Sequence, residues 1–320
     1  MPIAQSDRAL VSGASDSGST PDGHVFIQIL MNDNIKRLYK LTEKCSLCPR
    51  KCGVNRLKGE LGFCRSANEI KVASINIHTG EEPPISGTKG SGTVFFSNCT
   101  LSCVFCQNYP ISQLGNGYLL TTEQLADKML ELQKKEVHNI NFVTPSHMYH
   151  LIAESVFIAR QKGLKIPILA NCSGYESVET LELMEDFIDI YMPDMKYADD
   201  KFAKKYSNVS DYTKVNKSAI KEMFRQKGNL FINNSEIAEK GLLIRHLVLP
   251  NAIAGSKDIF DFIANEISVN AYVSVMAQYH TANKSDEVEE LARKITEEEY
   301  DQSVNDFYDS GLHNGWVQDL

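Results

Sequence analysis

Short apolar runs alternate with longer amphipathic stretches along most of this chain. Six runs rich in β-branched residues predict strands, at residues 93–97, 139–144, 166–170, 188–193, 242–249 and 272–278. Five stretches in which apolar residues recur every three to four positions predict helices, at residues 121–136, 148–163, 177–186, 212–228 and 256–267. Nearly unbroken apolar strands separated by helices predict a parallel sheet covered by helices.

This alternation places the chain in the α/β fold class and leaves two architectures open. Six strand–helix units span roughly 200 residues, fewer than the ~250 that are typical of a closed eight-unit barrel. A partial (β/α)6 TIM-like barrel and an open doubly wound sheet both satisfy the pattern. In either architecture, ligands bind at the carboxyl ends of the strands.

The residues before the first of these strands differ from the rest in composition. Residues 1–25 are rich in Ser, Gly and Asp and predict a disordered leader. Residues 26–90 hold four cysteines, several glycines and little periodicity, which predicts a small N-terminal metal-binding module. Residues 91–312 carry the strand–helix units, and a helical tail is expected to continue to residue 320.

The overall composition excludes several classes of protein. The chain of 320 residues is 42% hydrophobic and 23% charged, as in globular proteins, and its net charge of −8 comes without a basic stretch for nucleic acid. No apolar run approaches the ~20 residues of a membrane helix. Because the N-terminus also has no signal-peptide core, we expect no membrane association and a cytoplasmic location. In a reducing compartment, the eight cysteines favour metal binding over disulfides.

Three cysteines follow directly after the first predicted strand. Cys99, Cys103 and Cys106 have the spacing C-x3-C-x2-C, with the aromatic Phe105 before the last of them. Three thiolates hold three irons of a [4Fe–4S] cluster, whereas an electron-transfer cluster takes four. The absent fourth ligand would leave one iron open to a substrate or cofactor, as at a catalytic zinc. A zinc site with a distant fourth ligand and three buried structural thiols are the alternatives.

This CxxxCxxC motif, with its aromatic residue, resembles that of the radical S-adenosylmethionine (radical SAM) superfamily. The stretch "CVFCQN" resembles the pyruvate formate-lyase activating enzymes, and the chain from about Cys45 to Tyr300 resembles relatives of these with an N-terminal "CxxCPRxCGVNR…GExGFC" module. The resemblance implies a partial βα barrel with S-adenosylmethionine on the open iron. It further implies that one electron from the cluster cleaves this cofactor to methionine and a 5′-deoxyadenosyl radical, which abstracts hydrogen from a substrate.

The run "YMPDMKY" at the end of the fourth strand corresponds to a cofactor-binding segment of these enzymes. The resemblance implies that Lys196 neutralises the carboxylate of S-adenosylmethionine. It also implies that Asp194 and the backbone carbonyl of Met192 lie at a monovalent cation site. A surface ion pair on a βα loop is the alternative.

Other strand ends carry further candidates for cofactor binding. The resemblance implies that Asn171, Cys172 and Ser173 line the cofactor, although Asn171 replaces an acidic residue of the family. It makes Arg245 the cofactor-side candidate on the fifth strand, with His246 as a hydrogen-bonded residue behind it. It also implies that His280 approaches the adenosine, against the alternative of a structural histidine. Like Asn171 and Ser173, Phe105 would then contact the cofactor.

One family feature has no counterpart in this chain. The "GGE"-type turn that receives the cofactor's amino group is replaced by "NFVTPSHMYH", which has no Glu. Thr144, Ser146, His147 or main-chain carbonyls beside Pro145 would have to take over. His147 and His150 resemble a metal-binding pair, but two histidines at a helix start are more often solvated.

The N-terminal module has four cysteines with the spacing C-x2-C-x3-C-x11-C, namely Cys45, Cys48, Cys52 and Cys64. Four thiolates close a tetrahedral zinc site or hold a second [4Fe–4S] cluster, and the spacing does not choose between the two. Zinc would staple a segment that cannot build its own core. A second cluster would act as an electron relay or a redox centre facing the substrate.

These motifs support three hypotheses of function. The first is a radical SAM enzyme that installs a glycyl radical on a partner protein, with reduced flavodoxin or ferredoxin as the electron donor that the resemblance implies. The second is a radical SAM enzyme that acts on a different peptide or small molecule. The third is an iron–sulfur electron carrier or a metal-binding regulator. The sequence does not name the substrate, because specificity in such folds lies in side chains of the site rather than in the cluster motif.

Overall fold

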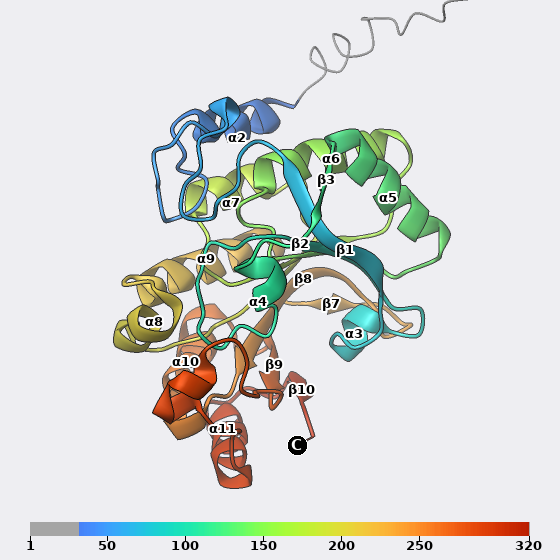
Figure 1. The fold of residues 1–320 in the computed structure, drawn as a ribbon. Helices are drawn as coiled ribbons and strands as arrows, with labels where there is room; N and C mark the ends of the chain where they lie inside the picture. Colours follow the sequence, from blue (N-terminus) through green and yellow to red (C-terminus); the bar gives the residue numbers. More distant parts are fainter. Residues whose placement is uncertain (1–31, 320) are drawn as a thin grey trace, which may run out of the picture. The chain divides into compact units, whose positions relative to one another are not determined.

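The computed structural model describes residues 32–319, and a ten-stranded sheet lies at its centre (Figure 1). Six strands that run parallel to one another form the middle of the sheet: β2 (Ser91–Phe96), β4 (Ile140–Val143), β5 (Ile168–Cys172), β6 (Ile190–Pro193), β8 (Ala238–Leu247) and β9 (Tyr272–Met276). Each coincides with one of the six predicted strands. The predicted leader, residues 1–25, lies outside the described residues.

The order of the strands distinguishes between the two predicted architectures. Across the sheet the parallel strands follow one another in chain order, from β2 through β4, β5, β6 and β8 to β9. A doubly wound sheet instead reverses its strand order at a switch point. No pairing between the two edges of the sheet closes it within residues 32–319. The predicted α/β fold, with a mostly parallel sheet that stops short of a closed barrel, is therefore confirmed.

Four shorter or antiparallel strands complete the sheet. They are β1 (Ile70–His78), β3 (Tyr118–Leu120), β7 (Phe231–Ile232) and β10 (Gly315–Val317). β1 pairs with both β2 and β3 in antiparallel register, while β10 extends the other edge parallel to β9. β1 was not among the predicted strands, although Ile70 and Val72 alternate with polar residues as the strand period of two requires.

Helices cover the outer side of the sheet. The five predicted helices correspond to α5 (Thr122–Lys134), α6 (Tyr149–Gln161), α7 (Val178–Met184), α9 (Tyr212–Lys227) and α10 (Ser256–Phe262). α5 begins where it does because Thr121 and Gln124 form a capping box that satisfies the first backbone N–H groups. The remaining helices are α2 (Asp33–Glu43), α3 (Pro83–Ser86), α4 (Tyr109–Ser112), α8 (Asp200–Ser207) and α11 (Glu297–Asp309). Among residues 32–319, no helix has the length and apolar character that crossing a membrane requires.

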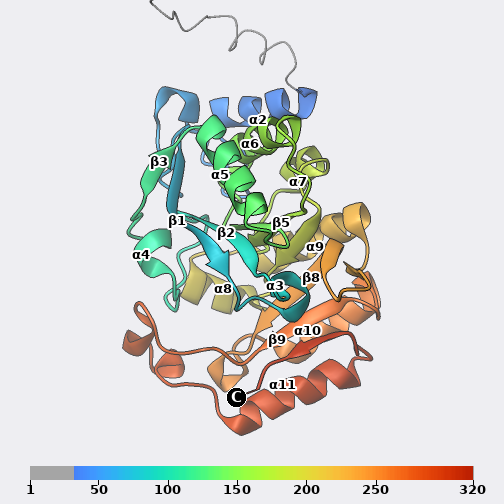
Figure 2. The same cartoon turned by 90° about the vertical axis from the view of Figure 1, so that its right-hand side faces the viewer.

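The segment between β1 and β2 closes the barrel at the amino ends of its strands. β1 runs antiparallel to β2, so that His78 at its end lies opposite Ser91, the first residue of β2. The short helix α3 follows and lies near the ends of β2 and β8 (Figure 2). Its Ile85 packs against Leu169 and other apolar residues of the parallel strands, namely Ile190, Met192, Ala238 and Leu243. A ligand in the barrel is therefore enclosed from this end by residues of the N-terminal segment.

The sheet and its helices share a core in which Phe142 is a central residue. The Phe142 side chain is fully buried, and its ring centroid lies 5.7 Å from that of Phe96 on the neighbouring strand. We expect Phe142→Ala to lower the free energy of unfolding by about 3–5 kcal/mol, because the deletion removes buried apolar surface and leaves a cavity. Urea denaturation would measure this loss. Leu119→Ala, at a residue that is 55% exposed, is the control, and an equal loss in both variants would contradict the assignment of the core.

Candidate functional site

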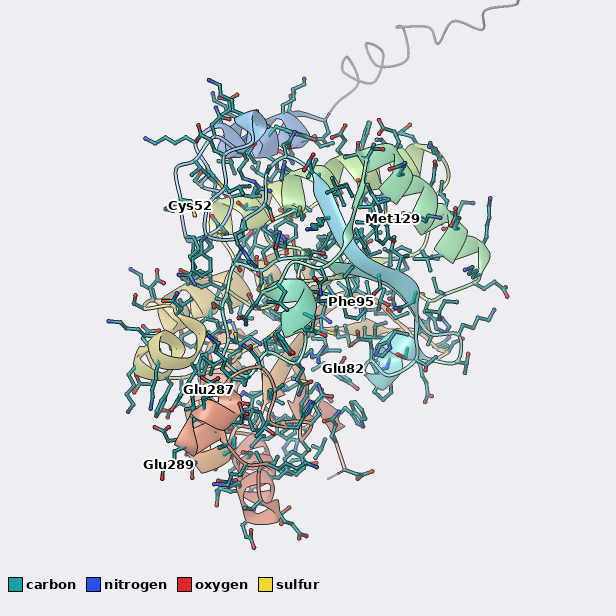
Figure 3. All side chains as sticks on the ribbon, viewed as in Figure 1. Cys52, Glu82, Phe95, Met129, Glu287 and Glu289 are labelled. Carbon is teal, nitrogen blue, oxygen red and sulfur yellow. The ribbon has the colours of Figure 1, made fainter. Side chains whose placement is uncertain are left out.

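A cavity of about 390 Å³ runs through the interior of the barrel. Cys99, Thr144, Ser173 and Lys196, which lie just past the carboxyl ends of β2, β4, β5 and β6, line one part of it. Glu81 and Glu82, from the turn before α3, line another part; Figure 3 labels Glu82 together with Phe95, a cavity-lining residue of β2. The cavity therefore extends from the predicted cofactor end of the strands toward their amino ends.

The loop after β2 directs all three cysteines of the CxxxCxxC motif to this cavity. Cys99, Cys103 and Cys106 are all among its lining residues. The loop is held on α8, because the backbone N–H groups of Ser102 and Val104 donate hydrogen bonds to the carbonyl oxygens at its end, Ser207 (3.3 Å) and Tyr206 (2.8 Å). These backbone bonds fix the loop without using a thiol, so the sulfur atoms stay available as ligands.

Each of the three thiols also has a hydrogen-bond partner. The Ser207 hydroxyl donates to Cys103 Sγ at 2.9 Å, and the Leu101 N–H donates to Cys99 Sγ at 3.3 Å. Cys106 Sγ lies 3.1 Å from Ser112 Oγ. Hydrogen bonds to the sulfur atoms are one of the means by which a protein sets the reduction potential of an iron–sulfur cluster.

The chemistry of these thiols fits an iron–sulfur cluster. Burial, with repulsion from the neighbouring thiol, raises the pKa of Cys99 to about 12, and burial raises the pKa of Cys103 to about 11 despite the attraction of Lys196. A bound metal deprotonates such a thiol outright. Within residues 32–319, no three Cys, His, Asp or Glu side chains converge as ligands of one ion. A [4Fe–4S] cluster does not require this, because each thiolate binds a different iron.

Phe105 lies behind the cysteine loop rather than in the cavity. Its side chain is buried between Tyr197 and Tyr279, with ring centroids 6.4 and 6.1 Å away. His280 is also apart from the cysteines: it lines a neighbouring cavity of about 590 Å³ and lies 3.2 Å from the Gln107 side chain, between Nδ1 and Nε2. The structure thus does not bring these two predicted cofactor contacts into the main cavity, and their roles stay predictions.

The segment after β6 places one cation beside the cysteines. Lys196 Nζ forms an ion pair of 2.5 Å with Asp194 Oδ2, and both residues line the cavity. Burial lowers the pKa of Lys196, but the attraction of Asp194 and the thiols outweighs it, so the pKa is raised and the ammonium group stays charged. Met192 does not line the cavity, because its side chain is fully buried in the apolar cluster around Ile85.

Arg245 and His246 point to opposite sides of β8, as neighbours in a strand do. Arg245 lines the cavity and is 14% exposed, whereas His246 is fully buried behind the strand. His246 Nδ1 lies 2.9 Å from the Met195 carbonyl oxygen, and Nε2 lies 2.9 Å from Ser256 Oγ. Burial lowers the pKa of His246 to about 4. The predicted place of His246 behind Arg245 is therefore confirmed.

Three carboxylates surround the Arg245 guanidinium group. Glu82 Oε1 and Glu81 Oε2 are each 3.3 Å from one of its nitrogen atoms, and Asp194 Oδ1 is 3.8 Å away. Glu81 also accepts a hydrogen bond of 3.0 Å from the Asn141 side chain on β4. Burial raises the pKa of Glu81, in spite of the attraction of Arg245. Glu81, Glu82 and Asn141 were not among the predicted site residues. An acidic pair before two prolines and a polar residue inside an apolar strand are the sequence features that indicate them.

The segment that replaces the "GGE" turn contributes two residues to the cavity, Val143 and Thr144. Thr144 is the polar one of the two. Its φ of 61° is unusual for a β-branched side chain, and such a conformation costs about 1–3 kcal/mol. Ser146 instead donates to Glu176 at 2.7 Å, and His147 Nε2 lies 2.8 Å from the Ser97 carbonyl oxygen. Of the three side chains considered for the cofactor's amino group, Thr144 alone lines the cavity.

The expectation that His147 and His150 are solvated is wrong. Their exposed fractions are 1% and 0%. The reason is that the N-terminal module covers the start of α6: Arg56 Nη1 donates a hydrogen bond of 2.8 Å to the His147 carbonyl oxygen. The His150 ring also packs edge-on against Tyr39 of α2, with centroids 5.3 Å apart. Burial lowers the pKa of His147 to about 4, so the ring is neutral near pH 7.

The N-terminal module contacts the cysteine loop through Arg50. Arg50 Nε donates a hydrogen bond of 2.9 Å to the carbonyl oxygen of Thr100, next to Cys99, and its guanidinium carbon lies 3.7 Å from the ring centroid of Phe63. Arg50 follows the second cysteine of the module by two residues. The module and the predicted cluster site are thus joined by a direct contact.

Local backbone geometry gathers the four module cysteines. Cys45, Cys48 and Cys64 are buried, and Cys52 is partly exposed. Figure 3 labels Cys52. The chain turns back on itself at Cys45, whose N–H donates to Val54 and whose carbonyl accepts from Gly53. Gly62 is required beside Cys52, because a Cβ atom there would come within 2.8 Å of the sulfur. The metal of this module, zinc or a second cluster, stays a prediction.

The carboxyl end of β5, the third of the six parallel strands, brings the buried side chain of Glu176 close to the cavity. Asn171, Cys172 and Ser173 all line the cavity, and burial raises the pKa of the Cys172 thiol. Cys172 is 2% exposed and interacts with Glu176, which is also 2% exposed. Burial raises the pKa of Glu176 to about 7, although hydrogen bonds from Ser146 and Cys172 oppose this shift. Glu176 therefore changes its charge near neutral pH.

Comparison with known proteins agrees with this geometry. Residues 93–234 match the family model of the Radical SAM superfamily. The part of the chain that carries the cysteine motif therefore matches the superfamily that the motif predicted, and that superfamily implies a [4Fe–4S] cluster and S-adenosylmethionine.

Individual proteins show similarity over a longer part of the chain. The chain is 29% identical to the uncharacterized protein MJ0674 of Methanocaldococcus jannaschii, over 86% of this chain and 77% of that protein. It is 23% identical to the uncharacterized protein MJ0808 of the same organism, over 70% of this chain and 67% of that protein. Among solved structures, the FeFe-hydrogenase maturase HydG from Carboxydothermus hydrogenoformans shares the fold, with a TM-score of 0.50, 11% identity and coverage of 71% of this chain. The match spans 52% of the maturase chain, about half of its length.

The buried Glu176 gives a pH dependence of stability. Its pKa is about 7 in the folded protein against an ordinary value of 4.5, so the folded state binds this proton more tightly than the unfolded state. The stabilisation is complete below pH 4.5 and is lost as the pH rises to about 7. We expect wild type to lose about 3 kcal/mol relative to Glu176→Gln over this range, at about 1.4 kcal/mol per pKa unit.

Urea denaturation of both proteins at pH 4.5, 6 and 8 measures this difference. Glu179→Gln changes the same functional group at an exposed position on the next turn of the chain and is the matched control. Its stability relative to wild type should not vary with pH. A constant difference between wild type and Glu176→Gln would contradict the assignment.

Proposed function

We propose that this chain is a radical SAM enzyme that cleaves S-adenosylmethionine reductively and abstracts hydrogen from a substrate held inside the barrel. The observation that supports this most strongly is the presence of three thiols of one loop and the ammonium group of Lys196 in a single cavity. An electron carrier needs four cluster ligands and no such cavity. The third hypothesis, a carrier or regulator, is therefore disfavoured.

The side chains around the cavity divide the tasks of this reaction. Cys99, Cys103 and Cys106 would hold three irons of the cluster, and the fourth iron would bind the amino and carboxylate groups of S-adenosylmethionine. Lys196, kept charged by Asp194, would neutralise that carboxylate. When bound, the cluster and this cofactor together supply a carbon radical that removes a hydrogen atom from the substrate. The buried walls of the cavity exclude water from the radical.

Two classes of substrate compete within this proposal. A glycine of a partner protein is the first, on the resemblance to the pyruvate formate-lyase activating enzymes. The charged wall formed by Glu81, Glu82 and Arg245 favours the second, a polar peptide or small molecule, because a glycine backbone carries no charge to match it. Zinc or a second cluster in the N-terminal module and a monovalent cation near Asp194 are compatible with both substrates.

The cleavage reaction tests the proposed function directly. We expect the anaerobic, cluster-loaded protein, reduced by flavodoxin or ferredoxin, to release 5′-deoxyadenosine from S-adenosylmethionine. Cys103→Ala should lower this release by a factor of about 10³ or more, because the cluster loses one of its three ligands. Ser102→Ala, on the same loop and outside the cavity lining, is the matched control and should keep the activity.

Addition of a glycyl radical enzyme from the same organism separates the two substrate classes. An electron paramagnetic resonance doublet of a glycyl radical would identify the partner protein. Release of 5′-deoxyadenosine without this doublet would favour the second class. If cluster-loaded wild type releases no 5′-deoxyadenosine, the proposed enzymatic function is wrong.

A further inference from the structure

The charged groups around the cavity are not balanced. Three carboxylates, those of Glu81, Glu82 and Asp194, line it together with the cations Arg245 and Lys196. When S-adenosylmethionine is bound, its carboxylate adds a fourth negative group to the three carboxylates, and Arg245, Lys196 and the sulfonium group of the cofactor supply three positive charges. Buried charges require partners, since an unpaired one costs several kcal/mol in a protein interior. The charged groups at the cavity therefore have a negative net charge, which a further cation would neutralise.

Two oxygen atoms in this region lack donors. Glu82 Oε2 and Asn141 Oδ1 are both buried and have no hydrogen-bond partner within residues 32–319. Glu82 is 3% exposed and Asn141 is fully buried. Their other side-chain atoms are engaged, since Glu82 Oε1 contacts Arg245 and Asn141 Nδ2 donates to Glu81. Because buried acceptors are satisfied in nearly all native structures, these two indicate a ligand that donates hydrogen bonds.

Glu81 and Glu82 enter this charged region from the end of the barrel opposite to the cysteine loop. They belong to the turn at the amino end of β2, whereas Cys99 follows its carboxyl end. Arg245 joins the two ends, because its Nε lies 3.3 Å from Glu82 Oε1 and 3.8 Å from Asp194 Oδ1. The amino group of S-adenosylmethionine is assigned to the open iron, and its sulfonium group has no N–H to donate. The remaining donors of the cofactor, its ribose hydroxyls and its adenine amino group, are uncharged, so the cofactor supplies no charged N–H donor to Glu82 and Asn141.

The number of free oxygens favours an amine over a metal ion. Calcium takes six to eight oxygen ligands and magnesium takes six in octahedral geometry, and these two acceptors are far short of either number. An ammonium group has three donors and one positive charge. One donor would satisfy Glu82 Oε2, which belongs to a cavity-lining residue, and the charge would match the excess of carboxylates.

We propose that Glu82, Glu81 and Asn141 form a subsite that binds the protonated amino group of the substrate, held deep in the barrel by Arg245 and α3. This inference rests on the proposed function and names the chemical class of its substrate, an amine. Glu82 accepts a hydrogen bond from the ammonium group, Glu81 adds negative charge, and Asn141 positions Glu81 through its hydrogen bond of 3.0 Å. The subsite fixes the amino group of the substrate beside Arg245, and a carbon of its chain would then face the radical.

A small amine tests the subsite without knowledge of the full substrate. Calorimetry on the cluster-loaded protein with S-adenosylmethionine would compare n-butylammonium chloride, 1-butanol and potassium chloride. We expect n-butylammonium to bind at least about 10-fold more tightly than 1-butanol, because a charged hydrogen bond is formed in a buried site. Glu82→Gln should weaken the binding of n-butylammonium about 10-fold or more and leave that of 1-butanol unchanged.

Two further variants keep the test decisive. Glu81→Gln removes the same charge from the neighbouring residue and should also weaken amine binding, in case Glu82→Gln disturbs the fold. Glu287→Gln removes a carboxylate from an exposed position outside the cavity and should bind the amine as wild type does (Figure 3). Circular dichroism of each variant checks that it is folded.

The possible results separate this inference from the proposed function. Equal binding of n-butylammonium and 1-butanol, no binding of the amine, or binding of potassium alone would each overturn the amine subsite. Release of 5′-deoxyadenosine is measured on the same samples. If release occurs and the amine does not bind, the proposed function stands and the subsite is wrong; if the amine binds without release, the subsite stands and the proposed reaction is wrong.

Discussion

The docking of the cysteine loop on the end of α8 is the constraint on which the candidate site depends. Two backbone hydrogen bonds, from Ser102 and Val104, fix the loop, and the Ser207 side chain at the same helix end donates to Cys103 Sγ. Because the backbone bonds do not involve the sulfur atoms, the three thiols can face the cavity together. Lys196 and Asp194 lie a few residues before α8, so the same segment that holds the loop also brings a cation to it.

The N-terminal segment acts on the barrel at both of its ends. Near the carboxyl ends of the strands, Arg50 contacts the loop of Cys99 through Thr100, and Arg56 covers the start of α6. At the amino ends, α3 closes the barrel with Ile85 and presents Glu81 and Glu82 to Arg245. The segment therefore has two physical roles. It covers the cysteine loop from outside, and it places the charged side chains of Glu81 and Glu82 at the amino ends of the barrel strands.

Much of the fold could be predicted from the sequence, because the patterns that indicate each strand and helix lie within short stretches of the chain. The six parallel strands are apolar runs buried on both faces, and five helices follow the period of 3.6 residues. The cysteine loop was recognisable for the same reason, since its three ligands lie within eight residues. The succession of strands across the sheet could not be predicted, because periodicity does not record which strands are neighbours.

The features that could not be predicted depend on contacts between residues that are far apart in the sequence. Glu81 meets Arg245 across 164 positions of the sequence, and the four-residue helix α3 that follows it is too short for a periodic signal. The burial of His147 depends on Arg56, 91 positions earlier. Phe105 and Met192 lie in apolar packing outside the cavity, which a motif cannot distinguish from contact with a cofactor.

The claim on which this account rests is that the three-cysteine loop leaves one iron open to S-adenosylmethionine. Electron paramagnetic resonance of the reduced, cluster-loaded protein measures this before and after the cofactor is added. The account predicts that S-adenosylmethionine changes the signal of the reduced [4Fe–4S] cluster in wild type, and that Cys103→Ala lacks this cluster signal. A wild-type cluster signal that S-adenosylmethionine leaves unchanged would contradict it.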